Sequence, residues 1–137
     1  MDTSLERFVT AQDHVLEAVN AELARGAKQS HWMWFVFPQI AGLGHSPMAQ
    51  RFAIASPAEA KAYAAHPVLG ARLRGWTRLV LGHADRSAHD IFGSPDDLKF
   101  RSSMTLFARA VPEEPLFARA LDRFYGGGRD EATLQRL

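Results

Sequence analysis

Aromatic and polar side chains gather in one early segment and could form the wall of a ligand pocket. Trp32 and Trp34 offer indole faces that can stack on a nucleobase or a similar ring, and Gln39 offers an amide. Glycines in the following loop, residues 40–46, would let the backbone approach a ligand closely. Ser46 precedes a proline, and the helix predicted to start there would present free N–H groups to a phosphate. The same residue types are also typical of a core and its turns, so both interpretations remain open for the two tryptophans.

A later segment combines positive charges with hydroxyl groups inside one predicted helix. Its four candidate ligand-binding residues are Lys99, Arg101, Ser102 and Ser103. The two cations could bind an anionic group through charge-assisted hydrogen bonds. The hydroxyl residues have a low helical propensity, so something other than local preference must keep them in a helix. We expect at least two of the four side chains to face the same cavity as Trp34 or Gln39. The alternative is that the hydroxyls serve helix packing and bond to the preceding turn.

Asp97 is the candidate for acid–base catalysis, because its carboxylate lies at the start of the same predicted helix. An acidic residue at that place also favours the helix dipole, which is a purely structural role. The six histidines lack metal-ligand spacing, and the chain contains no cysteine. The sequence therefore predicts no metal site and no cofactor.

The composition of the 137-residue chain is that of an average globular domain, with 47% hydrophobic and 23% charged residues. The net charge of +1 provides no strong field, so we expect neither nucleic acid nor an anionic membrane as a partner. The longest apolar run, residues 32–37, is too short to span a bilayer. The first residues lack the features of a signal peptide. We therefore expect a cytoplasmic protein with a small anionic ligand, and the sequence leaves any protein partner unidentified.

Helix signals dominate the chain and predict a mainly α fold. We expect a single compact domain over residues 1–137, with about six or seven helices packed irregularly and not as a simple four-helix bundle. Apolar residues at three- and four-residue steps predict a first helix over residues 3–25, with Thr3 and Glu6 as a capping pair. Further helices are predicted from residue 47, over 57–65, from 67 to about 80, and over 87–92, 95–111, 115–125 and 130–137.

Ser-Pro pairs supply several of these helix starts. Ser46, Ser56 and Ser94 each precede a proline and are predicted as N-caps. His66, before another proline, is predicted to cap the helix that follows it. Residues 31–37 fit a strand by aromatic density and a helix by their flanks. We favour a buried helical turn there, because no other segment offers a partner strand.

Several motifs together resemble one bacterial family. They are residues 30–39, 42–44, 66–70, 92–99 and 102–107. The chain is similar over almost its whole length to the uncharacterised "domain of unknown function 1810" family, many of whose members carry the name calpastatin. Calpastatins are disordered, repetitive and highly polar, and nothing in this unrepeated chain supports that name. The resemblance implies a small, single-domain, mainly helical protein and no established activity.

A second likeness is to the helical NADAR family, which is linked to ADP-ribose and cleaves N-glycosidic bonds. The shared features are the aromatic motif, the Ser-Pro-x-Glu-Ala-Lys segment of residues 56–61, and the basic helix of residues 101–104. The NADAR aromatic motif carries a glutamate that residues 31–39 lack. The oxocarbenium-like transition state of such a reaction needs a nearby carboxylate, which Asp97 or Glu59 would have to supply.

These observations predict a pocket between residues 32–39 and the helix that carries residues 97–105. Its ligand would be a nucleotide- or ribosyl-phosphate-like anion, and an N-glycosidase would be the enzyme version of this hypothesis. The alternative is a non-enzymatic binding or interaction module with Trp32 and Trp34 at a protein contact. A concave pocket would support the first hypothesis, and a flat apolar patch would support the second.

Overall fold

The computed structural model describes residues 4–137, which form ten helices and no strand, and six of these helices have seven residues or more. In chain order they are α1 (Glu6–Asp13), α2 (Leu16–Arg25), α3 (Met33–Val36), α4 (Pro47–Arg51), α5 (Pro57–Ala65), α6 (Leu69–Leu81), α7 (Ala88–Phe92), α8 (Asp96–Ala110), α9 (Pro115–Tyr125) and α10 (Glu131–Leu134). The mainly α prediction is confirmed. The expected number of six or seven helices was too low, because the short helices α3, α4, α7 and α10 add to the longer ones and the first predicted helix divides into α1 and α2.

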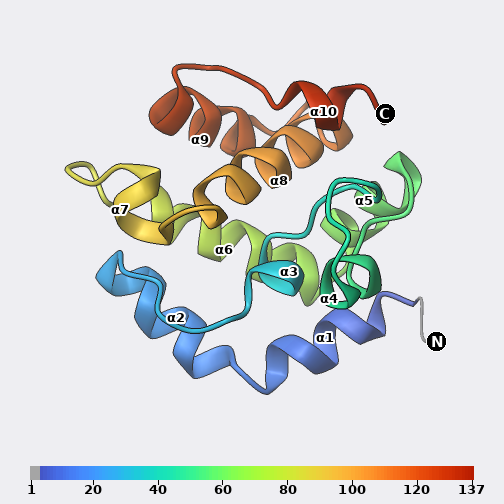
Figure 1. Cartoon of the computed structure of the whole chain (residues 1–137), viewed down its shortest axis with the longest axis horizontal. Coiled ribbons are helices and arrows are strands. Elements are labelled where there is room, and N and C mark those ends of the chain that lie inside the picture. The colour runs from blue at the N-terminus through green and yellow to red at the C-terminus, as the bar shows by residue number, and fades with distance from the viewer. Residues whose placement is uncertain (1–3) are drawn as a thin grey trace.

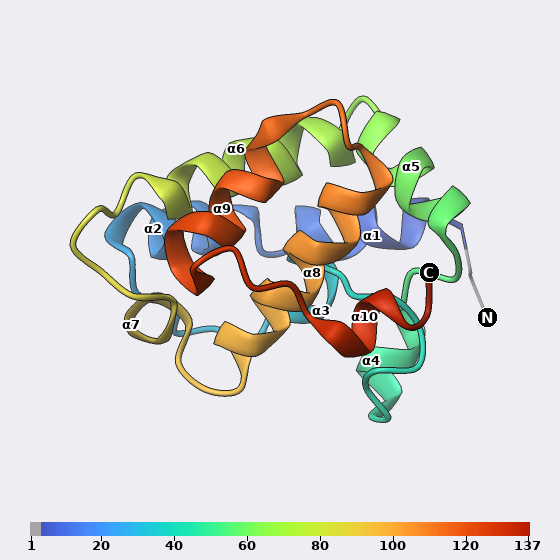
Figure 2. The ribbon, with the colours of Figure 1, turned by 90° about the horizontal axis from the view of Figure 1, so that it is seen from above.

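Helix α8 lies at the centre of the fold, and α5, α7, α9 and α10 pack against it (Figure 1). The view from above places α9 over one end of α8 and shows α1 and α2 on the far side (Figure 2). All nine residues that α8 buries lie between Phe100 and Ala110. A helix that is enclosed on most sides explains why this segment tolerates small hydroxyl residues, since these let neighbouring helices approach closely.

Aromatic rings form two connected groups inside the core, with ring centroids 4.7–6.2 Å apart. One group runs through Phe35, Phe52, Phe8, Tyr63, Phe107 and Phe117. The other contains Phe37, Phe92, Phe100 and Phe124. Residues 33–36 form α3, so the predicted buried helical turn is confirmed. Phe35 and Phe37, which flank the end of this turn, pack in the two ring groups.

The first predicted helix is two helices. Val15 has a non-helical backbone (φ −126°, ψ 12°), and the chain bends there between α1 and α2. The bend lets the two halves follow different partners, since α1 packs on α3 and α2 packs on α6. Gln12 at the bend is fully buried, and its amide donates to the Phe35 carbonyl oxygen (2.7 Å). The predicted cap at Thr3 lies outside the described residues.

Predicted helix starts are confirmed where a side chain accepts a hydrogen bond from an N–H group of the first turn. The hydroxyls of Ser46 and Ser56 accept from the N–H groups of Ala49 and Glu59, as predicted. Val68 takes the N-cap place of α6, and the His66 Nδ1 accepts from the N–H groups of Val68 and Leu69, so His66 serves the first amide of that helix as predicted.

The cap predicted at Ser94 is wrong. Helix α8 begins at Asp96, and Pro95 takes the N-cap place without a side-chain cap. The first amides find other acceptors, since the Asp97 N–H donates to the Gly93 carbonyl oxygen and the Leu98 N–H to that of Pro95. The hydroxyl of Ser94 is therefore not needed.

This difference between two Ser-Pro pairs can be measured. We expect Ser56→Ala to lower the free energy of unfolding by about 1 kcal/mol, because the Glu59 N–H loses its acceptor. Ser94→Ala serves as the matched control and is expected to change it by roughly 0.5 kcal/mol or less. Urea unfolding of both variants tests the assignment, and equal losses would contradict it.

Candidate functional site

Two neighbouring cavities flank the segment of residues 39–49. The larger, here called the lysine cavity, has a volume of about 410 Å³, and its polar lining residues are Gln39, His45, Ser46, Lys99, Ser102 and Asp130. The smaller, here called the tryptophan cavity, has a volume of about 190 Å³ and is walled by Trp34, Ile40, Phe52 and their neighbours. Gln39, Gly44 and Ala49 line both. Cavities of 420 and 400 Å³ elsewhere contain none of the candidate site residues.

Lys99 and Ser102 come to the lysine cavity from successive turns of α8. The Lys99 Nζ lies 3.7 Å from the Asp96 Oδ1 and 5.7 Å from the centre of the Trp34 ring. The Ser102 Oγ lies 2.8 Å from the Asp130 Oδ2 and 3.2 Å from the Leu98 carbonyl oxygen. Two of the four candidates on α8 thus share a cavity with Gln39.

The other two candidates on α8 lie elsewhere. The Arg101 guanidinium donates to the carbonyl oxygens of Gly128 (2.9 Å) and Arg129 (3.0 Å) and lies over the Tyr125 ring. Ser103 is fully buried, and within residues 4–137 its Oγ has no hydrogen-bond partner. Arg101 therefore fastens the segment before α10 to α8, and Ser103 packs in the core.

The two tryptophans also separate. Trp32 has 0% exposure, and its indole N–H donates to the Glu22 Oε1 (3.0 Å). Trp34 is half-buried and lines the tryptophan cavity. Only Trp34 is placed where a ligand ring could stack on it.

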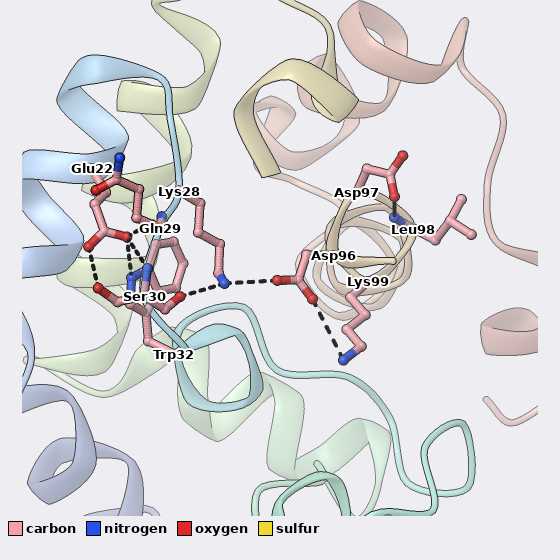
Figure 3. Close-up of polar contacts among 9 residues, drawn as sticks. All are labelled: Glu22, Lys28, Gln29, Ser30, Trp32, Asp96, Asp97, Leu98 and Lys99. Carbon is pink, nitrogen blue, oxygen red and sulfur yellow. Dashed lines mark hydrogen bonds and ion pairs between the residues drawn. The ribbon is translucent and has the colours of Figure 1, made fainter. Parts of the chain in front are cut away.

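Asp97 projects from α8 on the side opposite to Lys99 (Figure 3). Its Oδ1 accepts from the Leu98 N–H (2.9 Å), and its Oδ2 lies 3.5 Å from the His89 Nδ1. Its backbone carbonyl oxygen accepts from the Tyr125 hydroxyl. Asp97 lines neither the lysine cavity nor the tryptophan cavity.

A chain of charges holds the start of α8 against the loop that precedes α3 (Figure 3). The Lys28 Nζ lies 2.8 Å from the Asp96 Oδ2, donates to the Ser30 carbonyl oxygen (2.6 Å) and sits 5.0 Å from the centre of the Trp32 ring. Asp96 in turn contacts Lys99 with its other oxygen. Asp96 thus links the loop before α3 to Lys99 at the cavity.

Glu22 organises the same loop from the buried face of α2. Its Oε1 accepts from the N–H groups of Gln29 and Ser30 and from the Trp32 indole, and its Oε2 accepts from the Ser30 hydroxyl. Burial raises the pKa of the Glu22 carboxyl, but these hydrogen bonds to the charged form outweigh burial and lower the pKa from 4.5 to about 2. Glu22 is therefore ionised in the folded protein under neutral conditions.

His45 and Asp130 are the polar residues of the lysine cavity that were not among the predicted site residues. Asp130 precedes α10, at the start of the helix predicted over residues 130–137, and its Oδ2 accepts from the Thr133 N–H (3.2 Å). The same oxygen meets the Ser102 hydroxyl, 28 residues away in sequence. No local pattern signals that contact, because it arises from the packing of α10 on α8.

The described residues offer neither a cluster of metal-binding side chains nor a membrane-spanning helix. Residues 4–137 contain no group of three or more His, Cys, Asp or Glu side chains that could hold a metal ion. In the described part of the chain, none of the helices has both the length and the apolar character needed to cross a membrane.

Comparisons with known proteins identify the family and give no activity. The model of the DUF1810 family, described as a protein of unknown function, matches residues 2–137. A conserved hypothetical protein from Mycobacterium tuberculosis, Rv1873, has a similar crystal structure, with a TM-score of 0.96 and 53% sequence identity over 97% of this chain and 95% of that one. A search of curated proteins finds no match. Both the sequence motifs and the fold thus lead to the same conclusion: the chain belongs to the DUF1810 family.

Proposed function

We propose that this protein binds a small phosphorylated ligand of the nucleotide or ribosyl-phosphate class across the two cavities. The observation that carries the proposal is that the two cavities adjoin, since Gln39, Gly44 and Ala49 line both of them. A ligand with an anionic end and an aromatic ring could place the anion in the lysine cavity and the ring beside Trp34. Together the cavities fall within the size range of small-molecule sites.

Lys99 supplies the positive charge for the anionic end. Asp96 lies closer to Lys28 (2.8 Å) than to Lys99 (3.7 Å), so its carboxylate is shared and only loosely bound to the Lys99 ammonium. The Lys99 side chain is 29% exposed, which leaves its donors accessible. A phosphate oxygen at this place would gain a charge-assisted hydrogen bond.

Trp34 supplies a surface for the aromatic end. Its half-buried indole stands beside Ile40 and Phe52 in a mostly apolar cavity, an environment that favours stacking over solvation. The ring is also near the Lys99 ammonium, 5.7 Å from its centre. Stacking and charge pairing could therefore act on one ligand.

The other two hypotheses have less support. Cleavage of an N-glycosidic bond requires a carboxylate beside the sugar, and the two carboxylates expected to supply it, Asp97 and Glu59, line neither cavity. Asp130 does line the lysine cavity, where its Oδ2 is held by Ser102 and Thr133. A protein contact through both tryptophans requires both to be accessible, and Trp32 is fully buried. We therefore propose binding as the function of the site and assign no catalytic role to Asp97.

Calorimetric titration with AMP, ribose 5-phosphate and inorganic phosphate tests the proposal. We expect Lys99→Met to weaken AMP binding by roughly 10–100-fold, the effect of losing one charge-assisted hydrogen bond. Trp34→Leu is expected to weaken binding of AMP and to leave binding of ribose 5-phosphate unchanged, because only AMP carries a base.

Arg119→Met is the matched control. Arg119 is exposed on α9 and lines neither cavity, so this variant removes the same charge elsewhere. The proposal fails if no phosphorylated compound binds the wild-type protein, or if Lys99→Met binds AMP as tightly as Arg119→Met does.

A further inference from the structure

We infer that Asp130 makes the lysine cavity selective for a phosphorylated polyhydroxy compound, such as a sugar phosphate, over a simple phosphate. The inference rests on the proposed anion binding at Lys99 and adds the chemistry of the rest of the ligand. The carboxylate of Asp130 lines the same cavity as the Lys99 ammonium, an arrangement that a simple anion site would not have.

Neighbouring hydroxyl groups fix the orientation of the Asp130 carboxylate. Its Oδ2 accepts from the Thr133 N–H and hydroxyl and lies 2.8 Å from the Ser102 Oγ. Its backbone N–H donates to the Thr105 Oγ1 (2.9 Å). All of these carboxylate contacts use one oxygen, and the other, Oδ1, accepts no hydrogen bond from the described residues.

The free oxygen gives the cavity two poles of opposite charge. A phosphate alone would be attracted by Lys99 and repelled by Asp130. A ligand that also carries hydroxyl groups would donate one of them to the Asp130 Oδ1 and place its phosphate at Lys99. Gln39, His45 and Ser46 also line the cavity and offer further polar partners. An ionised carboxylate that accepts from a hydroxyl forms one of the stronger classes of hydrogen bond.

The substitution Asp130→Asn replaces the acceptor of the ligand hydroxyl by a donor. It keeps an oxygen for the hydrogen bonds with Thr133 and Ser102 that support the fold. The Thr133 N–H and hydroxyl and the Ser102 hydroxyl all surround the Oδ2 position, so the amide oxygen is expected to stay there. The amide NH₂ then takes the place of the free oxygen and donates instead of accepting. Asparagine is also a good N-cap, so α10 is retained.

The experiment titrates ribose 5-phosphate and inorganic phosphate into the wild-type protein, Asp130→Asn and Asp130→Ser. The serine variant keeps a capping oxygen and removes the second one, so it tests the same contact if the asparagine variant folds poorly. Wild-type protein is expected to bind ribose 5-phosphate about tenfold more tightly than phosphate. Both variants are expected to lose this margin, with phosphate binding unchanged or stronger. Glu131→Gln, at the exposed neighbouring residue, is expected to behave as wild type.

The outcomes separate this inference from the function on which it rests. If the wild-type protein binds both compounds equally, or if the Asp130 variants keep the preference, the role of Asp130 is refuted while Lys99-dependent anion binding stands. If no phosphorylated compound binds the wild-type protein, both proposals are refuted.

Discussion

Glu22→Ala is expected to destabilise the protein by about 3 kcal/mol or more. The substitution removes the acceptor of the Gln29 and Ser30 N–H groups and of the buried Trp32 indole. The buried Trp32 N–H that is left without a partner costs about 1–3 kcal/mol. The loss of the contacts to the less buried Gln29 and Ser30 adds to this cost. Chemical denaturation at neutral pH measures the loss. Glu17→Ala, at an exposed glutamate of the same helix, is the control and is expected to change stability little.

The charge of Glu22 gives this prediction a second measurement. The pKa of the Glu22 carboxyl is about 2 in the folded protein, whereas its ordinary value, which applies to the unfolded chain, is 4.5. Folding therefore favours the ionised form. The stabilisation is complete above pH 4.5 and is lost as the pH falls toward 2, by roughly 3 kcal/mol in all. Glu22→Gln keeps an oxygen for the three N–H donors and loses the charge. We expect it to be less damaging than Glu22→Ala and to flatten the pH dependence between pH 4.5 and 2, and an unchanged pH profile would contradict the assignment.

The same carboxylate explains why the sequence alone could not decide between pocket and core for Trp32. Two tryptophans in three residues look equivalent in the chain, and both were interpreted as pocket or core residues. The partner of Trp32 is Glu22, ten residues earlier on α2. The Trp32 indole is buried because it donates to Glu22 of another helix, whereas the Trp34 indole lines a partly open cavity. That difference belongs to tertiary packing and leaves no local signal.

Helix boundaries were predictable where the determinant is local. The side chains of Ser56 and His66 accept from the first amides of α5 and α6, and a Gly with a left-handed backbone follows α2 and α9. The N-cap predicted at Ser94 is wrong because backbone carbonyl oxygens and the Asp97 side chain already accept from the first N–H groups of α8. The bend at Val15 was hidden because the apolar spacing continues through it, while the packing partner changes.

The candidate site was predictable as a region and not as a set of contacts. At least two of the four candidates on α8 were expected to face a cavity with Trp34 or Gln39, and Lys99 and Ser102 line the lysine cavity with Gln39. Arg101 lies on the same helix, yet carbonyl groups of residues 128 and 129 take its guanidinium. Asp130 joins the site through the packing of α10 on α8, which no local pattern describes.

Two glycines of α6 are expected to respond to the same substitution with opposite signs. A Cβ at Gly70 would lie 2.2 Å from the Ala64 carbonyl oxygen, which is backbone, and 2.8 Å from the Arg74 Nη1. That oxygen already accepts from Arg74 (2.7 Å), so the added methyl would part α5 from α6 and disturb a hydrogen bond. We expect Gly70→Ala to cost about 1–3 kcal/mol of unfolding free energy, the usual penalty for overpacking.

Gly75→Ala is the matched control within the same helix. A Cβ there meets nothing within 4 Å, and the position is exposed. Alanine restricts the unfolded chain more than glycine does and favours the helix, so we expect a gain of roughly 0.5–1 kcal/mol. Thermal and urea unfolding of both variants measure the two changes. A Gly70→Ala protein as stable as Gly75→Ala would mean that α5 and α6 do not approach as closely as the structure has them.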